Sequence, residues 1–403
     1  MNVPIKRKIA YIAITLLISL VIVEISLKLI ERIVYTSRIK SLEETLKEVA
    51  QHNPYRNIEI YKDRVPQARK FYNDLKKLRL AYRPYVERRR IPNQHLANIH
   101  INDWGYRGTE FTFRKPKQVF RIIIFGGSFV WGTGAIYDDE TISGHLEKLL
   151  NQNYINKRFE VINGGETGFV LTQERILFIE EAIFFSPDLV IFIDGVNDLW
   201  AAHNNLPAGF PIHYKAFNER LSINYKKPIK ETLRGQIKFL ENQLRINWQA
   251  LRRLTTVDAI KSFIRNATID NYHPEYQLAA KHLHNAEIIN IISKARGIDC
   301  VFGLQSILYL DKPLSIEEAK TEKLSTAIYP GFPEFAKTVY PKYRDILADA
   351  MKERKLHFCD FMNAFSIDSS TRYIDHFHLN GEGYRIIAEK LLEFLKKQKF
   401  FEQ

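Results

Sequence analysis

The chain has 403 residues, 45% of them hydrophobic and 26% charged, which indicates a globular protein with one large domain or a domain with an insertion. Its formal net charge is +13 at pH 7, but the basic residues form scattered clusters. No recognition-helix, zinc-finger or RNA-binding signature accompanies them, so we expect no nucleic-acid partner.

The N-terminus has the pattern of a membrane segment. Lys6, Arg7 and Lys8 precede an uninterrupted apolar or neutral run from Ile9 to Val23, and a thinner apolar pattern continues to about residue 30. The clean run is shorter than the roughly 20 residues of a spanning helix, so it also fits a signal peptide. Because no small-x-small cleavage site follows, we predict an uncleaved anchor over residues 1–30 with the rest of the chain on the extracytoplasmic side. A cleaved signal and a peripheral helix are the alternatives.

Residues 31–100 are rich in Lys, Arg, Glu and Tyr, with helical spacing in parts, and we predict a stalk and lead-in there. Residues 101–118 (INDWGYRGTEFTFRKPKQ) have the Gly, Asn, Asp and Pro content of an ordered loop. The predicted catalytic domain therefore spans residues 101–398.

From residue 119 onward the hydrophobic pattern alternates between two periods. Five β-rich runs predict buried strands: Val119–Phe125, Arg158–Asn163, Asp188–Asp194, Asp299–Leu304 and Leu356–Met362. Stretches with helical spacing lie between or after them: Thr141–Asn151, Thr172–Phe185, Pro274–Arg296, Pro333–Glu353 and Gly383–Lys397. This alternation predicts an α/β fold with a mostly parallel sheet of five strands and helices on both of its faces, which is a three-layer α/β/α sandwich. Sites in such sheets form at the carboxyl ends of the strands.

The segment of residues 201–273 interrupts this alternation. It has no convincing strand, several prolines and one stretch of helical spacing. We predict a helical insertion beside the site. A cap that lines the substrate pocket and an insertion without function are both consistent with it.

The two cysteines, Cys300 and Cys359, lie in apolar, strand-like stretches without a CxxC motif. Two buried thiols are the simpler interpretation, and a disulfide stays open if the domain lies outside the cytoplasm.

Polar side chains with catalytic chemistry follow the predicted strands. Ser128 lies in FGGSFVWG after the first strand, Gly168 ends NGGETG after the second, and Asn197 lies in DGVND after the third. Near the C-terminus, DHFHLNGEGY places Asp375 three residues before His378. A serine hydroxyl becomes nucleophilic when a histidine removes its proton, and a carboxylate orients that histidine. We therefore assign these roles to Ser128, His378 and Asp375.

The tetrahedral intermediate of acyl transfer carries a negative oxygen, which needs fixed hydrogen-bond donors. The candidates for this oxyanion hole are the backbone N–H groups of Ser128 and Gly168 and the side-chain amide of Asn197.

These four blocks, GGSF, NxGxxGF, GxND and DxxHLN in this order, resemble the SGNH (GDSL-type) hydrolase superfamily. The resemblance covers about residues 101–398, and NDWGYRG at residues 102–108 is similar to the lead-in of membrane-anchored bacterial members. It implies a five-stranded sheet of flavodoxin-like order. It also implies that Ser128, Gly168, Asn197 and His378 are the signature residues and Asp375 the triad acid. One departure is Gly127, where the usual triplet GDS reads GGS. Glu166, inside the second block, is also unexpected. We predict that it faces solvent, with a role in tuning the site as the alternative.

Several residues have a second interpretation. His376 competes with His378 as the base, although the spacing from Asp375 favours His378. A metal site is not expected, because the loop histidines and His273, His282 and His284 offer no clear ligand set, and no other cofactor is implied. Trp131 and Trp200 are candidates for stacking on a sugar ring, with core packing as the alternative.

Three functions are consistent with these features. The first is a membrane-anchored serine esterase that cleaves an acyl ester, in particular an O-acetyl group on a cell-surface or secreted glycan. The second is an O-acyltransferase that uses the same triad to move an acetyl group onto a polysaccharide, beside a membrane-embedded acyl donor protein; such donors are implied by the resemblance. The third is a binding or assembly protein without turnover, which the complete set of catalytic residues disfavours.

Overall fold

The computed structural model describes residues 58–214, 273–329 and 331–402. The predicted membrane anchor (residues 1–30) and residues 215–272 of the predicted insertion lie outside these ranges, so both stay predictions. None of the helices within these ranges is long and apolar enough to cross a bilayer.

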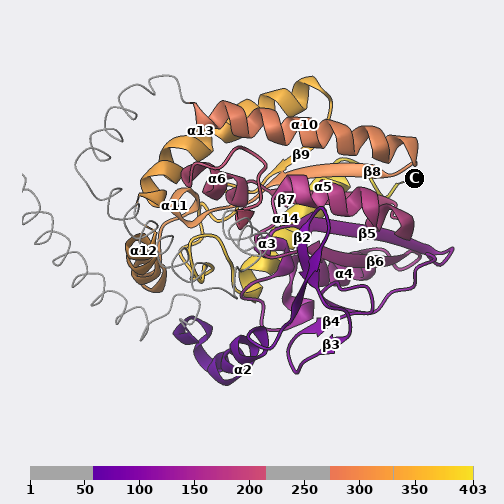
Figure 1. Cartoon of the computed structure of the whole chain (residues 1–403). Helices are drawn as coiled ribbons and strands as arrows, with labels where there is room; N and C mark the ends of the chain where they lie inside the picture. Colours follow the sequence, from indigo (N-terminus) through magenta and orange to yellow (C-terminus); the bar gives the residue numbers. More distant parts are fainter. Residues whose placement is uncertain (1–57, 215–272, 330, 403) are drawn as a thin grey trace, which may run out of the picture. The chain divides into compact units, whose positions relative to one another are not determined.

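A five-stranded parallel sheet forms the centre of the fold. Its strands match the predicted runs closely: β5 (Val119–Gly126), β6 (Arg158–Gly165), β7 (Leu189–Asp194), β8 (Asp299–Leu304) and β9 (His357–Asp360). Their spatial order is β6-β5-β7-β8-β9, and every neighbouring pair is parallel (Figure 1). This is the predicted flavodoxin-like order. The chain adds strands first on one side of β5 and then on the other, so the carboxyl ends of β5 and β7 flank the topological switch point where such folds bind ligands.

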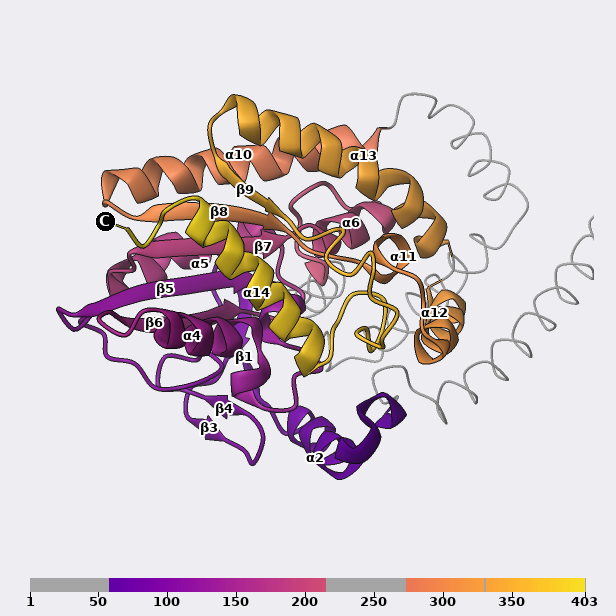
Figure 2. The ribbon, with the colours of Figure 1, turned by 180° about the vertical axis from the view of Figure 1, so that it is seen from behind.

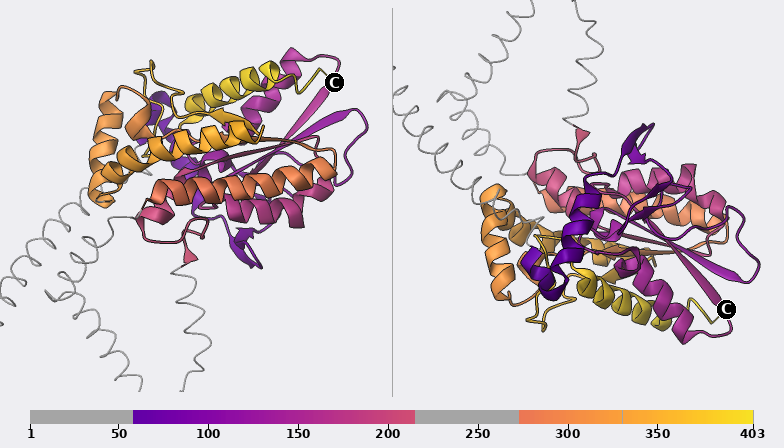
Figure 3. Two further views of the ribbon diagram at one scale, coloured as in Figure 1. Left: turned by 90° about the horizontal axis from the view of Figure 1, so that it is seen from above. Right: turned by 90° about the horizontal axis from the view of Figure 1, so that it is seen from below.

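Helices cover both faces of the sheet (Figures 2 and 3). One face carries α4 (Ile142–Asn153) and α14 (Gly381–Lys397), and the other carries α5 (Leu171–Glu180), α10 (Pro274–Ala295) and α13 (Phe332–Glu353). The predicted helix Thr172–Phe185 ends earlier, and a separate turn, η4 (Ala182–Phe185), follows it. The shorter helices are α3 (Ser128–Trp131), η3 (Asp138–Glu140), α6 (Val196–His203), α11 (Leu308–Asp311) and α12 (Ile316–Ile328).

The strands are apolar on both sides because both faces are covered. In β5, Ile123 and Phe125 pack on the α5–α10–α13 face, whereas Ile122 and Ile124 pack on the α4–α14 face, and all four are fully buried. This alternation explains why each strand appears in the sequence as a continuous hydrophobic run. Cys300 and Cys359 are buried free thiols, and burial raises their pKa to about 11 and about 12.

The segment before the sheet belongs to the same compact unit as the sheet. It contains η2 (Ile58–Arg64), α2 (Val65–Leu75), a hairpin of β1 (Leu80–Arg83) and β2 (Glu87–Arg90), and the pair β3 (Gln94–His95) and β4 (His100–Ile101). Phe71 and Ile101 are fully buried and pack in one cluster with Trp131, next to the strand-to-helix turn of Ser128. Residues 58–100 are therefore part of the folded domain and not a stalk, which corrects the predicted boundary at residue 101.

Candidate active site

Ser128 lies at a sharp turn between strand and helix. It is the first residue of α3, one residue beyond the end of β5, and its side chain is partly exposed at the carboxyl edge of the sheet. The turn requires two glycines. A Cβ at Gly126 would lie 2.6 Å from the Ile193 carbonyl oxygen, and a Cβ at Gly127 would lie 2.3 Å from Asn197 Nδ2. The glycine that departs from the GDS triplet therefore leaves room for the Asn197 amide.

Ser128, His378 and Asp375 form one chain of hydrogen bonds. His378 Nε2 is 2.6 Å from Ser128 Oγ, and His378 Nδ1 is 2.6 Å from Asp375 Oδ2. The other carboxylate oxygen of Asp375 accepts the backbone N–H groups of Phe377 (3.0 Å) and His378 (2.9 Å). His378 and Asp375 are both buried. When Nδ1 carries the ring proton and donates it to the carboxylate, Nε2 is the unprotonated nitrogen that can accept the Ser128 hydroxyl proton.

The loop that carries this histidine, residues 361–380, is tied to α12 by hydrogen bonds to Glu318, which also forms a buried ion pair. Glu318 Oε2 is 2.8 Å from Lys312 Nζ, and neither side chain is exposed to solvent. Glu318 Oε1 also accepts the backbone N–H groups of Arg372 (2.8 Å) and Tyr373 (3.0 Å). Since Asp375 follows two residues later, this pair fixes the start of the catalytic turn.

His376 does not contact Ser128. Its Nδ1 is hydrogen-bonded to the Tyr309 hydroxyl, and its ring packs against Tyr329 and Phe332. Burial lowers the pKa of His376 to about 3, so the ring is neutral at physiological pH. Of the two histidines considered from the sequence, the structure places only His378 against the serine.

The proposed oxyanion donors lie at the ends of three adjacent strands. Asn197 is in the first turn of α6, and its Nδ2 donates one hydrogen bond to the Phe169 carbonyl at 2.7 Å, which fixes the orientation of the amide. Gly168 has φ +76°, a left-handed conformation that favours glycine. Within the described ranges, neither the N–H of Ser128 nor that of Gly168 donates a hydrogen bond to the protein. Both are therefore available to an oxygen of the substrate.

Glu166 is fully buried, which corrects the prediction that it faces solvent. It pairs with Arg90 of the β1–β2 hairpin, with Glu166 Oε1 3.2 Å from Arg90 Nε. Its carboxylate also accepts the backbone N–H groups of Arg90 (3.2 Å) and Thr167 (3.0 Å). A buried carboxylate is tolerated only when its oxygens are paired, so breaking these contacts would be costly. They therefore hold the loop that carries Gly168 against the β1–β2 hairpin.

Trp131 is fully buried, which contradicts its predicted role in stacking on a sugar. Arg90 and Arg107 lie over its ring, with their guanidinium carbons 5.0 and 4.6 Å from the ring centroid. Arg107, from the NDWGYRG lead-in, also donates to the carbonyl oxygens of Gly132 (2.9 Å) and Ala135 (3.0 Å). Trp131 and Arg107 thus pack against the helical turn that begins with Ser128 and stabilise it.

Trp200 lies on α6 and is partly buried. Its ring packs against Tyr329 and Phe332 at centroid distances of 4.8 and 4.9 Å. Its predicted role in substrate binding stays a prediction.

A buried group of acids lies behind Asn197. Glu174, Asp194 and Asp198 are at most 6% exposed. Desolvation raises the pKa of Asp194 to about 8 and that of Asp198 to about 6, and the pKa of Glu174 is also raised, first by desolvation and then by Asp194. A proton shared by Glu174 and Asp194 explains how both remain buried at neutral pH. Among the residues that the structure covers, no group of His, Cys, Asp and Glu side chains could hold a metal ion.

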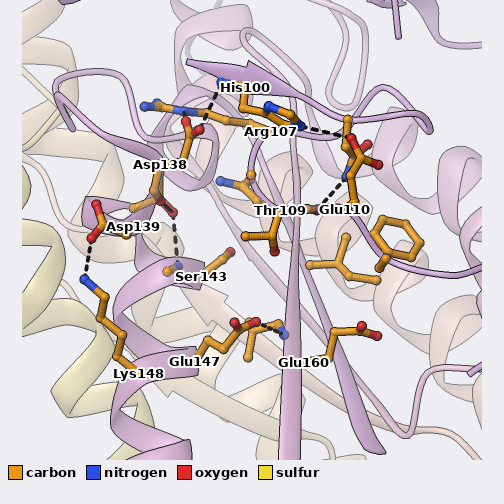
Figure 4. A pocket seen from close by; sticks show the side chains of 18 residues that line it. His100, Arg107, Thr109, Glu110, Asp138, Asp139, Ser143, Glu147, Lys148 and Glu160 are labelled. Carbon is orange, nitrogen blue, oxygen red and sulfur yellow. Dashed lines mark hydrogen bonds and ion pairs between the residues drawn. The ribbon is translucent and has the colours of Figure 1, made fainter. Parts of the chain in front are cut away.

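A separate cavity of about 590 Å³ lies beside the edge strand β6, between the segment of residues 100–111 and α4 (Figure 4). Two of its acidic side chains are engaged within the protein: Asp138 pairs with Arg107 at 2.7 Å, and Glu147 accepts the backbone N–H of Val161 at 2.7 Å. None of the Ser128, His378 and Asp375 side chains lines it, so the cavity is distinct from the site that these three residues form.

Sequence reasoning missed the supporting residues Arg90, Arg107 and Glu166. The signal for Glu166 was the presence of a carboxylate inside the second block, where it is unexpected. Arg90 had no such signal, because its partner is 76 residues away in the chain.

The chain was compared with known proteins. No curated protein matches it. Similar solved structures include LAE5, an α/β hydrolase from the metagenome of Lake Arreo, Spain, which is 10% identical with a TM-score of 0.39, over 68% of this chain and 94% of that one. Axe2, an acetylxylan esterase from Geobacillus stearothermophilus, is 14% identical with a TM-score of 0.37, over 68% and 93%. The acetyl xylan esterase AlAXEase is 14% identical with a TM-score of 0.38, over 68% and 98%.

A model of the GDSL-like lipase/acylhydrolase family matches residues 124–386. This is more than half of the chain, and it includes all four sequence blocks. The chain therefore belongs to the GDSL-like lipase/acylhydrolase family of SGNH-type hydrolases.

Proposed function

We propose that the protein is a serine esterase in which Ser128 is the nucleophile, His378 the general base and Asp375 the residue that orients it. The observation that carries this proposal is the pair of 2.6 Å contacts that join Ser128 Oγ to His378 and His378 to Asp375. A structural serine has no need of a buried base and carboxylate in this geometry.

The proposed reaction has two halves. In the first, Ser128 Oγ attacks the ester carbonyl carbon while His378 Nε2 takes the hydroxyl proton, and the resulting oxyanion is held by the N–H groups of Ser128 and Gly168 and the Asn197 amide. The carbon–oxygen bond to the alcohol then breaks, and His378 gives the proton to the leaving alcohol, which leaves an acyl-serine. In the second half, water attacks the acyl-serine and gives a proton to His378. The collapse releases the carboxylic acid and returns the proton to Ser128.

Labelling with a fluorophosphonate probe tests the nucleophile and base. The probe should modify Ser128 of the full chain, and Ser128→Ala should abolish the labelling. His378→Ala should reduce labelling to the background, whereas His376→Ala should keep it, because His376 does not contact the serine. Unchanged labelling of Ser128→Ala would refute the assignment.

We further propose that the substrate is an acylated glycan outside the cell, with an O-acetyl group as the acyl part. In the predicted anchor over residues 1–30 the basic residues Lys6, Arg7 and Lys8 come before the apolar run, which supports an extracytoplasmic catalytic domain held at the membrane. Removal of residues 1–35 should release the protein from the membrane fraction, and a protein that fractionates unchanged would contradict the anchor.

Hydrolysis and transfer share the acyl-serine and differ in the acceptor. Release of acetate should be compared with acetyl transfer to an added oligosaccharide. Hydrolysis predicts that acetate release exceeds transfer at all acceptor concentrations. Transfer that exceeds release would favour the O-acyltransferase alternative and a partnership with a membrane-embedded acyl donor.

A further inference from the structure

We propose that Arg88 and His213 form an anion subsite beside Gly168, which selects esters that carry a carboxylate close to the scissile bond. The proposal rests on the proposed esterase activity and specifies its substrate class.

The first argument is position. Arg88 lies in β2, and its Nη2 donates to the Thr167 carbonyl oxygen at 2.7 Å. A Cβ built on Gly168 would lie 2.9 Å from Arg88 Nη2 and 2.9 Å from His213 Nε2. Both side chains thus contact the residue whose N–H we assign to the oxyanion hole, although they come from segments far apart in the sequence.

The second argument is charge. The other arginines of the β1–β2 hairpin have acidic partners: Arg83 and Arg89 pair with Glu181, and Arg90 pairs with Glu166. Within the part of the chain that the structure describes, Arg88 pairs with no carboxylate. The nearby Glu166 is already engaged by Arg90 and by two backbone N–H groups.

The third argument is the cost of this arrangement. The Nε atom of Arg88 is buried and has no hydrogen-bond acceptor. Desolvation lowers the pKa of Arg88, which means that partial burial of the charged guanidinium costs free energy in this structure. A substrate carboxylate would offset that cost, because the planar guanidinium matches a carboxylate with two parallel hydrogen bonds.

His213 contributes a neutral ring to the subsite. Burial, and then the charge of Arg88, lowers its pKa to about 4, so it is uncharged at physiological pH. It can donate one hydrogen bond to an anion without adding a second positive charge. Because the subsite adjoins the oxyanion donor, the carboxylate that it binds must be within a few atoms of the ester carbonyl, on either the acyl or the alcohol side.

The test compares kcat/KM of the full-length protein for matched chromogenic esters. Mono-4-nitrophenyl succinate, with 4-nitrophenyl butyrate as its neutral match, places the carboxylate on the acyl side. 3-Carboxy-4-nitrophenyl acetate, with 4-nitrophenyl acetate as its match, places it on the alcohol side. The native protein should prefer the carboxylated ester in one of the two pairs, and the pair that shows the preference locates the charge.

Arg88→Gln should reduce that preference by about 10- to 100-fold, the range expected for losing a hydrogen bond to a charged group. Arg88→Lys, which keeps the charge but not the planar fork, should retain part of it. Arg83→Gln is the matched control, because it removes a partly exposed arginine of the same hairpin that pairs with Glu181. It should leave the preference unchanged.

Two results would overturn the subsite. One is a native protein without preference in either pair. The other is an Arg88→Gln variant that loses activity equally on carboxylated and neutral esters, since that would assign Arg88 to the support of the Gly168 loop. Arg88→Lys keeps the question answerable if Arg88→Gln does not fold. Failure of the esterase proposal itself looks different, because then no ester is turned over and the fluorophosphonate probe does not label Ser128.

Discussion

At the residue scale, the Asn197 amide occupies space that a side chain at position 127 would need, so this position requires glycine. A Cβ at position 127 would meet Asn197 Nδ2 at 2.3 Å, which is far inside contact distance. The amide is held in place from the other side by the Phe169 carbonyl. Any larger residue at position 127 must therefore push one proposed oxyanion donor out of position.

We expect Gly127→Ala to lower kcat on a model ester by about 10²- to 10³-fold, the loss typical of removing one oxyanion donor. Asn197→Ala should have a similar effect, with KM nearly unchanged in both. Because the two substitutions disable the same donor, the double variant should be no slower than the slower single variant. Additive losses would show that Gly127 acts through something other than Asn197.

The buried acids at the end of β7 predict a pH dependence of stability. In the folded state the pKa of Asp194 is raised to about 8 and that of Glu174 is also raised, whereas unfolded carboxyl groups titrate near pH 4. As the pH rises through this window, the unfolded chain releases protons that the folded protein keeps. The free energy of unfolding should therefore fall between about pH 4 and pH 8.

Glu174→Gln should remove part of this dependence and stabilise the protein above pH 7, since the amide needs no proton to stay neutral. Urea unfolding at pH 5, 7 and 8.5 measures the slope. Glu180→Gln is the control, because Glu180 lies on the same helix and is exposed. Equal pH slopes for the native protein and Glu174→Gln would contradict the shared-proton interpretation.

At the scale of elements, α4 protects the outer edge of the sheet. β6 is an edge strand, and its free backbone groups are covered by side chains of α4. Asn151 both accepts from the Phe159 N–H and donates to the Phe159 carbonyl, each at 3.0 Å, and Glu147 accepts the Val161 N–H. Such covering prevents an edge strand from pairing with another chain.

Asn151→Ala should lower the free energy of unfolding by about 1–3 kcal/mol, because it leaves two backbone groups of β6 without partners. It should also increase light scattering on mild heating. Asn153→Ala, in the last turn of the same helix, is the control with an expected change below about 0.5 kcal/mol, since Asn153 makes exposed hydrogen bonds to Leu149 and Lys396 and none of these reaches β6. Equal stability of the two variants would show that the edge is not protected in this way.

The elements that the sequence predicted well are those with long, regular hydrophobic patterns. The five strands followed from continuous runs such as the one that became β5, because a strand buried on both sides leaves an uninterrupted apolar segment. Their spatial order was implied by the family resemblance and not by the runs. The β1–β2 hairpin was missed because its strands are four residues long and β1 is exposed throughout. The Ser128, His378 and Asp375 contacts were anticipated from strand-end motifs, whereas the Arg90–Glu166 pair depends on tertiary contacts that no local pattern encodes.

At the scale of the whole described domain, the residues before the sheet are needed for the site. Phe71 and Ile101 pack in one cluster with Trp131, and Arg90 neutralises Glu166. A chain that begins at residue 101 would expose one face of this cluster and leave Glu166 buried without its cation.

We expect a chain of residues 58–403 to bind the fluorophosphonate probe at Ser128 and to unfold cooperatively. A chain of residues 101–403 should show a midpoint of thermal unfolding at least about 10 °C lower, or no cooperative transition, because large apolar side chains each contribute several kcal/mol when buried. Equal midpoints for the two chains would restore the boundary that the sequence suggested.

The distance along the chain between the proposed nucleophile and the proposed base has a consequence for biosynthesis. Ser128 and His378 are 250 residues apart in the sequence. The loop that carries His378 is hydrogen-bonded to Glu318 of α12, which also lies far from Ser128 in the sequence. A growing polypeptide therefore exposes its serine long before it can be activated. Esterolytic competence must arise abruptly, once translation has passed α14 and the final long-range contacts close. An enzyme built this way stays inert while it is being made.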